Sequence, residues 1–81
     1  MIVRIRLFAV AQQLAGRDVI SLEVPEGCTI GQLRARLAAE VPTLALVLPH
    51  VLFAVGTEYA KDDAAVAAGS DIACIPPVSG G

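Results

Sequence analysis

Aromatic side chains are scarce in this 81-residue sequence, which has no tryptophan, one tyrosine, two phenylalanines and a single histidine. Its core must therefore be built largely from alanine and short aliphatic side chains, although 56% of the residues are hydrophobic. A chain of this length forms one small domain, close to the lower limit for a self-sufficient core. Such a domain has no room for an enclosed pocket, so we expect no bound cofactor and no free-standing enzyme.

Cysteine is also scarce, because only Cys28 and Cys74 are present. Neither belongs to a CxxC pair, and His50 is the only histidine, so the chain offers too few ligands for a metal site. We expect both thiols to act as small hydrophobic side chains in a reduced, cytoplasmic protein. A disulfide between them is the alternative that the sequence leaves open.

Positive charge is neither abundant nor clustered. The formal net charge is −2 and the six Lys and Arg residues are scattered, whereas nucleic-acid binding requires a dense basic patch. The longest apolar run is far shorter than a membrane span, and the alternation near the start leaves no apolar segment of the kind found in secretory leaders. We therefore expect neither nucleic acid nor a membrane as a partner.

Two segments near the start alternate apolar and polar residues, which is the pattern of a half-buried strand. They cover residues 2–9 and residues 19–24. The connection, residues 10–14, predicts one or two helical turns that Gly16 ends. A strand, a short connection and a second strand predict an antiparallel hairpin. Its buried faces are expected to hold Val3, Ile5, Leu7, Ile20, Leu22 and Val24.

One principal helix is predicted over residues 30–41. Thr29 and Gln32 form a T-x-x-Q capping box at its start, and apolar residues then recur at steps of three and four. Pro42 ends the helix because the residue before a proline disfavours the helical conformation.

The polar residues of this helix are expected to face away from its apolar stripe. They are Arg34, Arg36 and Glu40, and the last two are spaced for an ion pair one turn apart.

The second half of the chain is divided by prolines and glycines into short segments. Within one of them, Asp62 or Asp63 could cap a helical turn that reaches Ala67 and ends at Gly69. The other segments, in chain order, are a loop or short helix over residues 43–48, a buried strand over 51–55, an edge strand at 59–60 and a last strand over 71–76.

This order of elements predicts an α+β fold of the β-grasp type, with one principal helix packed on one face of a mixed sheet. The last strand is expected to pair parallel to the first, so that the chain leaves from the middle of the sheet. A ferredoxin-like fold would need a second full helix, and no segment after Pro49 can supply one. We predict a β-grasp domain over residues 1–76 and a flexible arm over residues 77–81.

The arm reads Pro76-Pro77-Val78-Ser79-Gly80-Gly81. The prolines stiffen its base, and the two glycines have no Cβ that would obstruct a narrow channel. From Pro77 onward it can reach about 16 Å when extended. These properties suit a carboxyl group that enters the active site of another protein. A frayed end without function is the alternative.

Four motifs follow one another along the chain. They are Leu7-Phe8-Ala9, VPEGCTIGQLRARL at residues 24–37, Phe53-Ala54-Val55, and the segment from Ala68 to the Pro-Pro-Val-Ser-Gly-Gly end. In the order of these motifs the chain resembles the ubiquitin-like sulfur carriers, and among them the family of molybdopterin synthase small subunits. It departs from that family at Gly56 and at Gln12-Gln13.

The resemblance implies a mechanism centred on Gly81. An E1-like adenylyltransferase would use ATP to form a transient AMP adduct at its carboxylate, and a sulfur donor (a cysteine desulfurase or a rhodanese-like protein) would then displace AMP. The product is a thiocarboxylate, and Gly80 gives it clearance in the partner's channel. The family donates this sulfur to a pterin precursor held by the synthase large subunit, in a heterotetramer.

A docking surface is expected where the arm leaves the sheet. If Val3, Ile5 and Leu7 face the helix, Phe8 lies on the opposite face with Ile75 and Tyr59. Exposed apolar side chains at this point are typical of partner-binding patches. The predicted partner-binding residues are Phe8, Tyr59, Ile75, Pro76, Pro77, Val78 and Ser79. The alternative is that the first three are ordinary residues at the edge of the core.

Three other functions compete with this interpretation. The chain could be a thiamine-type or other ubiquitin-like sulfur carrier. It could be a ubiquitin-like modifier conjugated to lysines through Gly81, although the uncharged arm differs from the arginine-bearing arm of ubiquitin. It could also be an interaction domain whose end is inert.

Overall fold

The computed structural model describes residues 1–77, and the structure of residues 78–81 lies outside this range. Two α-helices and five strands alternate along the described chain with two short 3₁₀ turns, η1 (Pro42–Leu44) and η2 (Leu48–His50). The elements are β1 (Ile2–Leu7), α1 (Ala9–Ala15), β2 (Val19–Glu23), α2 (Ile30–Glu40), β3 (Leu52–Val55), β4 (Glu58–Ala60) and β5 (Asp71–Ile75).

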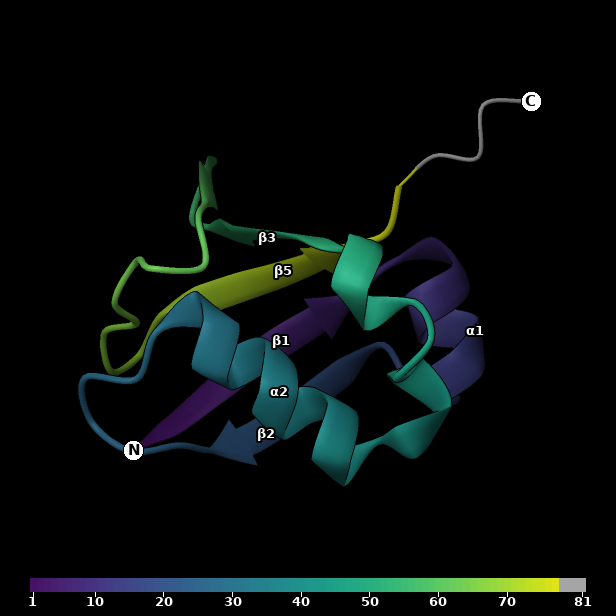
Figure 1. Ribbon diagram of the computed structural model, residues 1–81, viewed down its shortest axis with the longest axis horizontal. Coiled ribbons are helices and arrows are strands. Elements are labelled where there is room, and N and C mark those ends of the chain that lie inside the picture. Colours follow the sequence, from purple (N-terminus) through teal and green to yellow (C-terminus); the bar gives the residue numbers. More distant parts are fainter. Residues whose placement is uncertain (78–81) are drawn as a thin grey trace.

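The strands form one mixed sheet in the order β2-β1-β5-β3-β4. The β1–β2 hairpin is antiparallel, as the alternating segments predicted. Strand β5 pairs parallel to β1 and antiparallel to β3, so it occupies the centre of the sheet. Figure 1 shows α2 lying across one face of this sheet, with β1 and β5 side by side behind it. The predicted β-grasp fold and the departure of the chain from the middle of the sheet are confirmed.

The core lies between α2 and the sheet. The apolar side chains of β1 that were expected to be buried are at most 2% exposed, and those of β2 are also buried. Cys28 and Cys74 are both buried and free, so no disulfide joins them. The core therefore consists of one layer of side chains, which is what a small domain with few aromatic residues can build. Its largest members are Ile5, Leu7, Ile30, Leu33, Leu37, Leu44, Leu48, Phe53 and Ile72.

The start of α2 has the predicted capping box. The hydroxyl of Thr29 accepts a hydrogen bond from the backbone N–H of Gln32 at 3.2 Å. The Gln32 side chain accepts one in return from the Thr29 N–H at 2.9 Å. The predicted ion pair between Arg36 and Glu40 is also present, at 3.4 Å.

The prediction of a helical turn within residues 62–67 is wrong. This segment has turns but no helix, because its carbonyl groups serve the start of α2 instead. The Ile30 N–H donates to the Ala64 carbonyl and the Gly31 N–H to the Asp62 carbonyl, each at 2.9 Å. These two amides belong to the first turn of a helix, where no partner exists within the helix itself. The segment therefore acts as an external cap for α2.

The prediction that Arg34 points away from the core side of α2 is also wrong. Its guanidinium lies 4.9 Å from the centre of the Phe53 ring. It donates to the carbonyls of Leu48 at 2.5 Å and Val51 at 2.7 Å, and to the Asp62 carboxylate at 2.8 Å. A long arginine side chain can bury its stem along apolar surface and still satisfy its charged end, which the pattern of apolar residues does not reveal.

Candidate functional site

The root of the arm lies at the end of the central strand, where β5 passes into Pro76 and Pro77. A proline has no backbone N–H, so two in succession end the pairing of β5 with its neighbours. Pro76 is buried and Pro77 is exposed, which makes Pro77 the point at which the described chain leaves the domain. The remaining predicted arm residues, Val78, Ser79, Gly80 and Gly81, lie outside the described residues.

The open face of the sheet, on the side away from α2, carries apolar side chains beside this root. Ile75 is paired with Leu52 of β3, and Tyr59 of β4 is paired with Ala54. On the other side of β5, Leu7 of β1 is paired with Cys74, and Phe8 comes next in the chain. The Phe8 N–H donates to the Cys74 carbonyl at 3.3 Å. The strands therefore bring Phe8, Leu52, Tyr59 and Ile75 to one region, called here the apolar docking patch.

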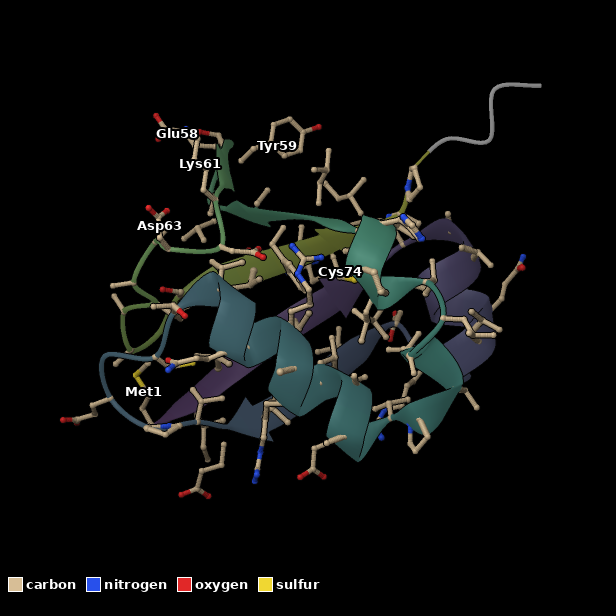
Figure 2. The ribbon with its side chains drawn as sticks, in the orientation of Figure 1. Met1, Glu58, Tyr59, Lys61, Asp63 and Cys74 are labelled. Atoms are coloured by element: carbon tan, nitrogen blue, oxygen red, sulfur yellow. The ribbon has the colours of Figure 1, made fainter. Side chains whose placement is uncertain are left out.

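Side chains of the apolar docking patch are accessible. Phe8 is 45% exposed, Leu52 53% and Tyr59 69%, whereas Ile75 is half-buried between its neighbours. Figure 2 shows the Tyr59 ring standing clear of the β4 end of the sheet. Isolated exposed apolar residues are normal on protein surfaces, but a group of them beside the root of the arm is typical of a docking site.

The sequence analysis does not include Leu52 among the partner-binding residues. It predicts a wholly buried strand over residues 51–55, and this prediction ignores the alternation of the side chains between the two faces. Phe53 is fully buried, so the period of two places Leu52 on the opposite face, and this signal could have identified it.

The other half of the open face carries charged side chains beside the exposed Ile2. Arg6 and Asp71, on the neighbouring strands β1 and β5, form an ion pair at 3.4 Å, and both side chains are more than half exposed. An exposed pair of this kind contributes at most about 1 kcal/mol to stability. Arg4 lies on the same face, directly opposite Asp71. This half can therefore contribute electrostatic complementarity to docking but little to the fold.

The corner between β1 and α1 holds Phe8 at a local cost in stability. Phe8 occupies the N-cap position of α1 and makes no capping hydrogen bond, whereas Ser, Thr, Asp or Asn at this position typically contributes about 1 kcal/mol. Ala9 has a φ of +52°, a left-handed conformation that costs a residue with a Cβ about 1 kcal/mol or more. Unfavourable local choices of this kind often occur where a residue is needed for binding.

The described residues contain no group of three or more His, Cys, Asp or Glu side chains placed to hold a metal ion. The Cys74 thiol is also a poor nucleophile, because burial raises its pKa to about 11 despite an opposing effect of the Arg34 charge.

None of the helices in the described part of the chain has the length and apolar character needed to span a bilayer.

Comparison with known proteins supports the resemblance seen in the sequence. The ThiS family profile matches residues 5–81. The molybdopterin synthase sulfur carrier subunit of Arabidopsis thaliana is 35% identical over 79 residues, which cover 98% of this chain and 82% of that protein. The subunit of the same name from Dictyostelium discoideum is 36% identical over 81 residues, covering 96% of this chain and 94% of that protein.

Among solved structures, SAMP1 from Haloferax volcanii matches with a TM-score of 0.88 and 29% identity, covering 100% of both chains. The fold of the chain thus agrees with that of a solved relative over its whole length. From the extent of the profile match and the identity to these relatives, we conclude that the chain belongs to the ThiS family.

Proposed function

We propose that this chain is the sulfur carrier subunit of a molybdopterin synthase and that it carries sulfur as a thiocarboxylate on Gly81. The observation that supports this most strongly is the position of the arm's root, at the end of the central strand and beside the apolar docking patch. A partner that receives the arm must also cover the surface around its root. Delivery of the arm and recognition of the domain are therefore a single binding event.

Activation precedes sulfur transfer, because a carboxylate is a poor electrophile. A Gly81 carboxylate oxygen attacks the α-phosphorus of ATP on an E1-like adenylyltransferase, and pyrophosphate leaves. The outer sulfur of a persulfide on a cysteine desulfurase or a rhodanese-like donor then attacks the carbonyl carbon, and AMP leaves. A second thiol attacks the donor's sulfur in the resulting acyl disulfide, so that a disulfide forms on the donor and the thiocarboxylate is released. In this proposal the carrier holds no cofactor of its own, and the AMP adduct is transient.

The acceptor in this proposal is a pterin precursor bound by the large subunit of the synthase. The relatives are named as subunits of a molybdopterin synthase, which supports a large subunit as the partner here, in a heterotetramer. The apolar docking patch would contact that subunit, with Pro77 to Ser79 leading into its channel and Gly80 passing the narrowest point. Positively charged groups that stabilise the developing charge would come from the partner. We place the carrier in the cytoplasm, where its two free thiols stay reduced.

The test is the intact mass of the protein after incubation with ATP, a sulfide source and an E1-like enzyme. We expect replacement of one oxygen by sulfur in the wild-type chain and no change in a variant that lacks Gly81. The thiocarboxylated protein, mixed with the large subunit and the pterin precursor, should then lose its sulfur. A carrier that is never thiocarboxylated by an enzyme that activates other ThiS family members would refute the proposal.

A second candidate function is protein modification. It is favoured by the likeness to SAMP1, a small archaeal modifier protein. A modifier would form isopeptide bonds between Gly81 and lysines of other proteins, and those adducts would persist in denaturing gels. A thiamine-type carrier would instead be thiocarboxylated but would transfer no sulfur to the pterin precursor.

A further inference from the structure

Few groups of this protein can attack an activated carboxyl group. The two thiols are the strongest potential nucleophiles, and both are at most 3% exposed. The Met1 amino group already donates a hydrogen bond to the Val24 carbonyl at 2.8 Å. The sequence contains a single lysine, Lys61. Lys61 therefore carries the one side-chain amine of the sequence, the group that forms a stable amide with an activated carboxyl group, and it lies at the surface.

Lys61 lies directly after β4, at the edge of the sheet, and is exposed. Its backbone carbonyl accepts a hydrogen bond from the Ala64 N–H at 3.0 Å, which fixes the turn that carries it. Its side chain borders a shallow surface hollow together with Glu58, Tyr59 and Asp63. Figure 2 shows Lys61 beside Glu58 at this end of the molecule, with Asp63 nearby.

Within the described residues the Lys61 amine is not held in an ion pair. The three ion pairs found within residues 1–77 join other residues, and the neighbouring Asp62 carboxylate is bound by Arg34. The nearby carboxylates of Glu58 and Asp63 stay accessible at the same hollow. The amine is therefore free to turn toward an incoming group.

We propose that Lys61 is the self-acylation site of this protein, where the activated carboxyl end of a second copy forms an isopeptide bond. The inference rests on the adenylation step of the proposed function. The Lys61 amine, after losing a proton to water, attacks the carbonyl carbon of the Gly81 adenylate. The C–N bond forms, the bond between that carbon and the phosphate oxygen breaks, AMP leaves, and the amine gives up its second proton to water.

Sulfur transfer and self-acylation then compete for the same adenylate. When a sulfur donor is present, its sulfur attacks the carbonyl carbon and the thiocarboxylated monomer forms. When no donor is present, the adenylate persists until the Lys61 amine of another copy attacks it. The linked dimer would thus accumulate under sulfur shortage and remain rare otherwise.

The first experiment uses no enzyme, so it tests the site apart from the activation step. The folded protein is incubated with an activated ester of the hexapeptide Pro-Pro-Val-Ser-Gly-Gly, and the acylated residues are mapped by mass spectrometry. We expect acylation at Lys61, its loss in Lys61→Arg, and no acylation of either cysteine until the chain is unfolded in urea. Faster acylation of Met1 or of a cysteine in the folded chain would overturn the proposal.

The second experiment adds ATP and the E1-like enzyme, with and without a sulfide source. Without sulfide we expect a covalent dimer linked from Gly81 to Lys61, and Lys61→Arg should abolish it. With sulfide, the wild-type chain and Lys61→Arg should be thiocarboxylated equally. A dimer that persists in Lys61→Arg, or formation of the adenylate with no dimer, would refute the Lys61 proposal alone. Absence of the adenylate would count against the proposed function, and the ester experiment would still decide the role of Lys61.

Discussion

Arg34 joins three parts of the molecule that are distant in the sequence. From its position on α2 it donates to the carbonyls of Leu48 and Val51, which flank the entrance to β3, and to Asp62 in the segment that caps the same helix. Its side chain is only 20% exposed. A group of this kind contributes through its hydrogen bonds to backbone carbonyls more than through its single ion pair, although the Leu48 carbonyl also accepts from the Val51 N–H.

We therefore expect Arg34→Met to lower the free energy of unfolding by about 2–4 kcal/mol, since two carbonyls and a carboxylate lose their donor. Urea denaturation followed by circular dichroism measures this change. Arg36→Met is the matched control, because Arg36 is half exposed and pairs only with Glu40. That control should stay within about 0.5 kcal/mol of the wild type. Equal losses in the two variants would contradict the role given to Arg34.

Cys74 should make stability depend on pH in the alkaline range. Burial raises the pKa of its thiol from 9.0 to about 11, so the unfolded chain loses this proton at a lower pH than the folded chain. The stabilisation is fully present below pH 9 and is lost as the pH rises through 11. The free energy of unfolding should fall by up to about 1.4 kcal/mol per pH unit in this window.

The measurement for Cys74 is a series of urea denaturation curves between pH 8 and pH 11, for the wild type and for Cys74→Ala. The variant is expected to be less stable at every pH, because it leaves a small cavity in the core. Its stability should nevertheless fall less steeply with pH. Parallel curves for the two proteins would show that the thiol does not contribute to this dependence.

At the level of the elements, α2 is fixed at its start by two sets of groups. Thr29 and Gln32 cap it from within, and the carbonyls of Asp62 and Ala64 cap it from a distant segment. A Cβ added to Gly31 would lie 3.3 Å from both the Cβ and the carbonyl oxygen of Asp62. The close approach of the two segments therefore requires a small residue at this position.

We expect Thr29→Ala to lower the free energy of unfolding by about 1 kcal/mol, the usual effect of removing an N-cap side chain. The change is measured by thermal or urea denaturation. Thr43→Ala serves as the control, because Thr43 is exposed within η1 and no hydrogen bond of its side chain is found in the described structure. If the control variant were destabilised as much as Thr29→Ala, the capping role would be disproved.

The elements that the sequence predicted correctly are those encoded by neighbouring residues. The alternation in β1 and the Thr29–Gln32 pair each act within a few residues, so they could be read without a structure. The failures have distant causes. The local sequence of residues 62–67 is typical of a capped helical turn. However, the carbonyls of Asp62 and Ala64 accept hydrogen bonds from the first amides of α2, about thirty positions earlier.

The candidate site, like the fold, was predictable where it depends on neighbouring residues and not where it depends on distant contacts. Phe8 and Tyr59 are found on the open face because strand alternation places them there. To predict that Leu52 lies on the open face, one must know which face Phe53 occupies. Arg34 was misjudged because a pattern of apolar positions cannot show where a long charged side chain ends.

At the level of the whole molecule, the two faces of the sheet have separate roles. One face is covered by α2 and holds the core, while the other carries the apolar docking patch and the ion pair of Arg6 with Asp71. Because Phe8, Leu52 and Tyr59 of the patch are exposed, they can be changed without disturbing the core. Binding and folding can therefore be tested independently in this protein.

We expect Leu52→Asp to weaken binding to the synthase large subunit by about tenfold or more, because in the proposed complex it would place a charge at the centre of a contact that excludes water. Its thermal stability should change little. Leu46→Asp is the matched control, since Leu46 is 91% exposed and lies outside the patch, between η1 and η2. Titration calorimetry with the large subunit measures both. Equal affinity of the two variants would place the interface elsewhere.

The central position of β5 also determines when the protein can fold during its synthesis. Ile5 pairs with Ile72, so the middle of the sheet joins residues near the two ends of the described chain. Contacts this distant in sequence slow folding, because a long loop must close before they form. On the ribosome the β1–β2 hairpin and α2 emerge early but lack their central strand. We expect a chain released before β5 is complete to fail to fold and to be open to proteolysis, so that products without the root of the arm would not persist.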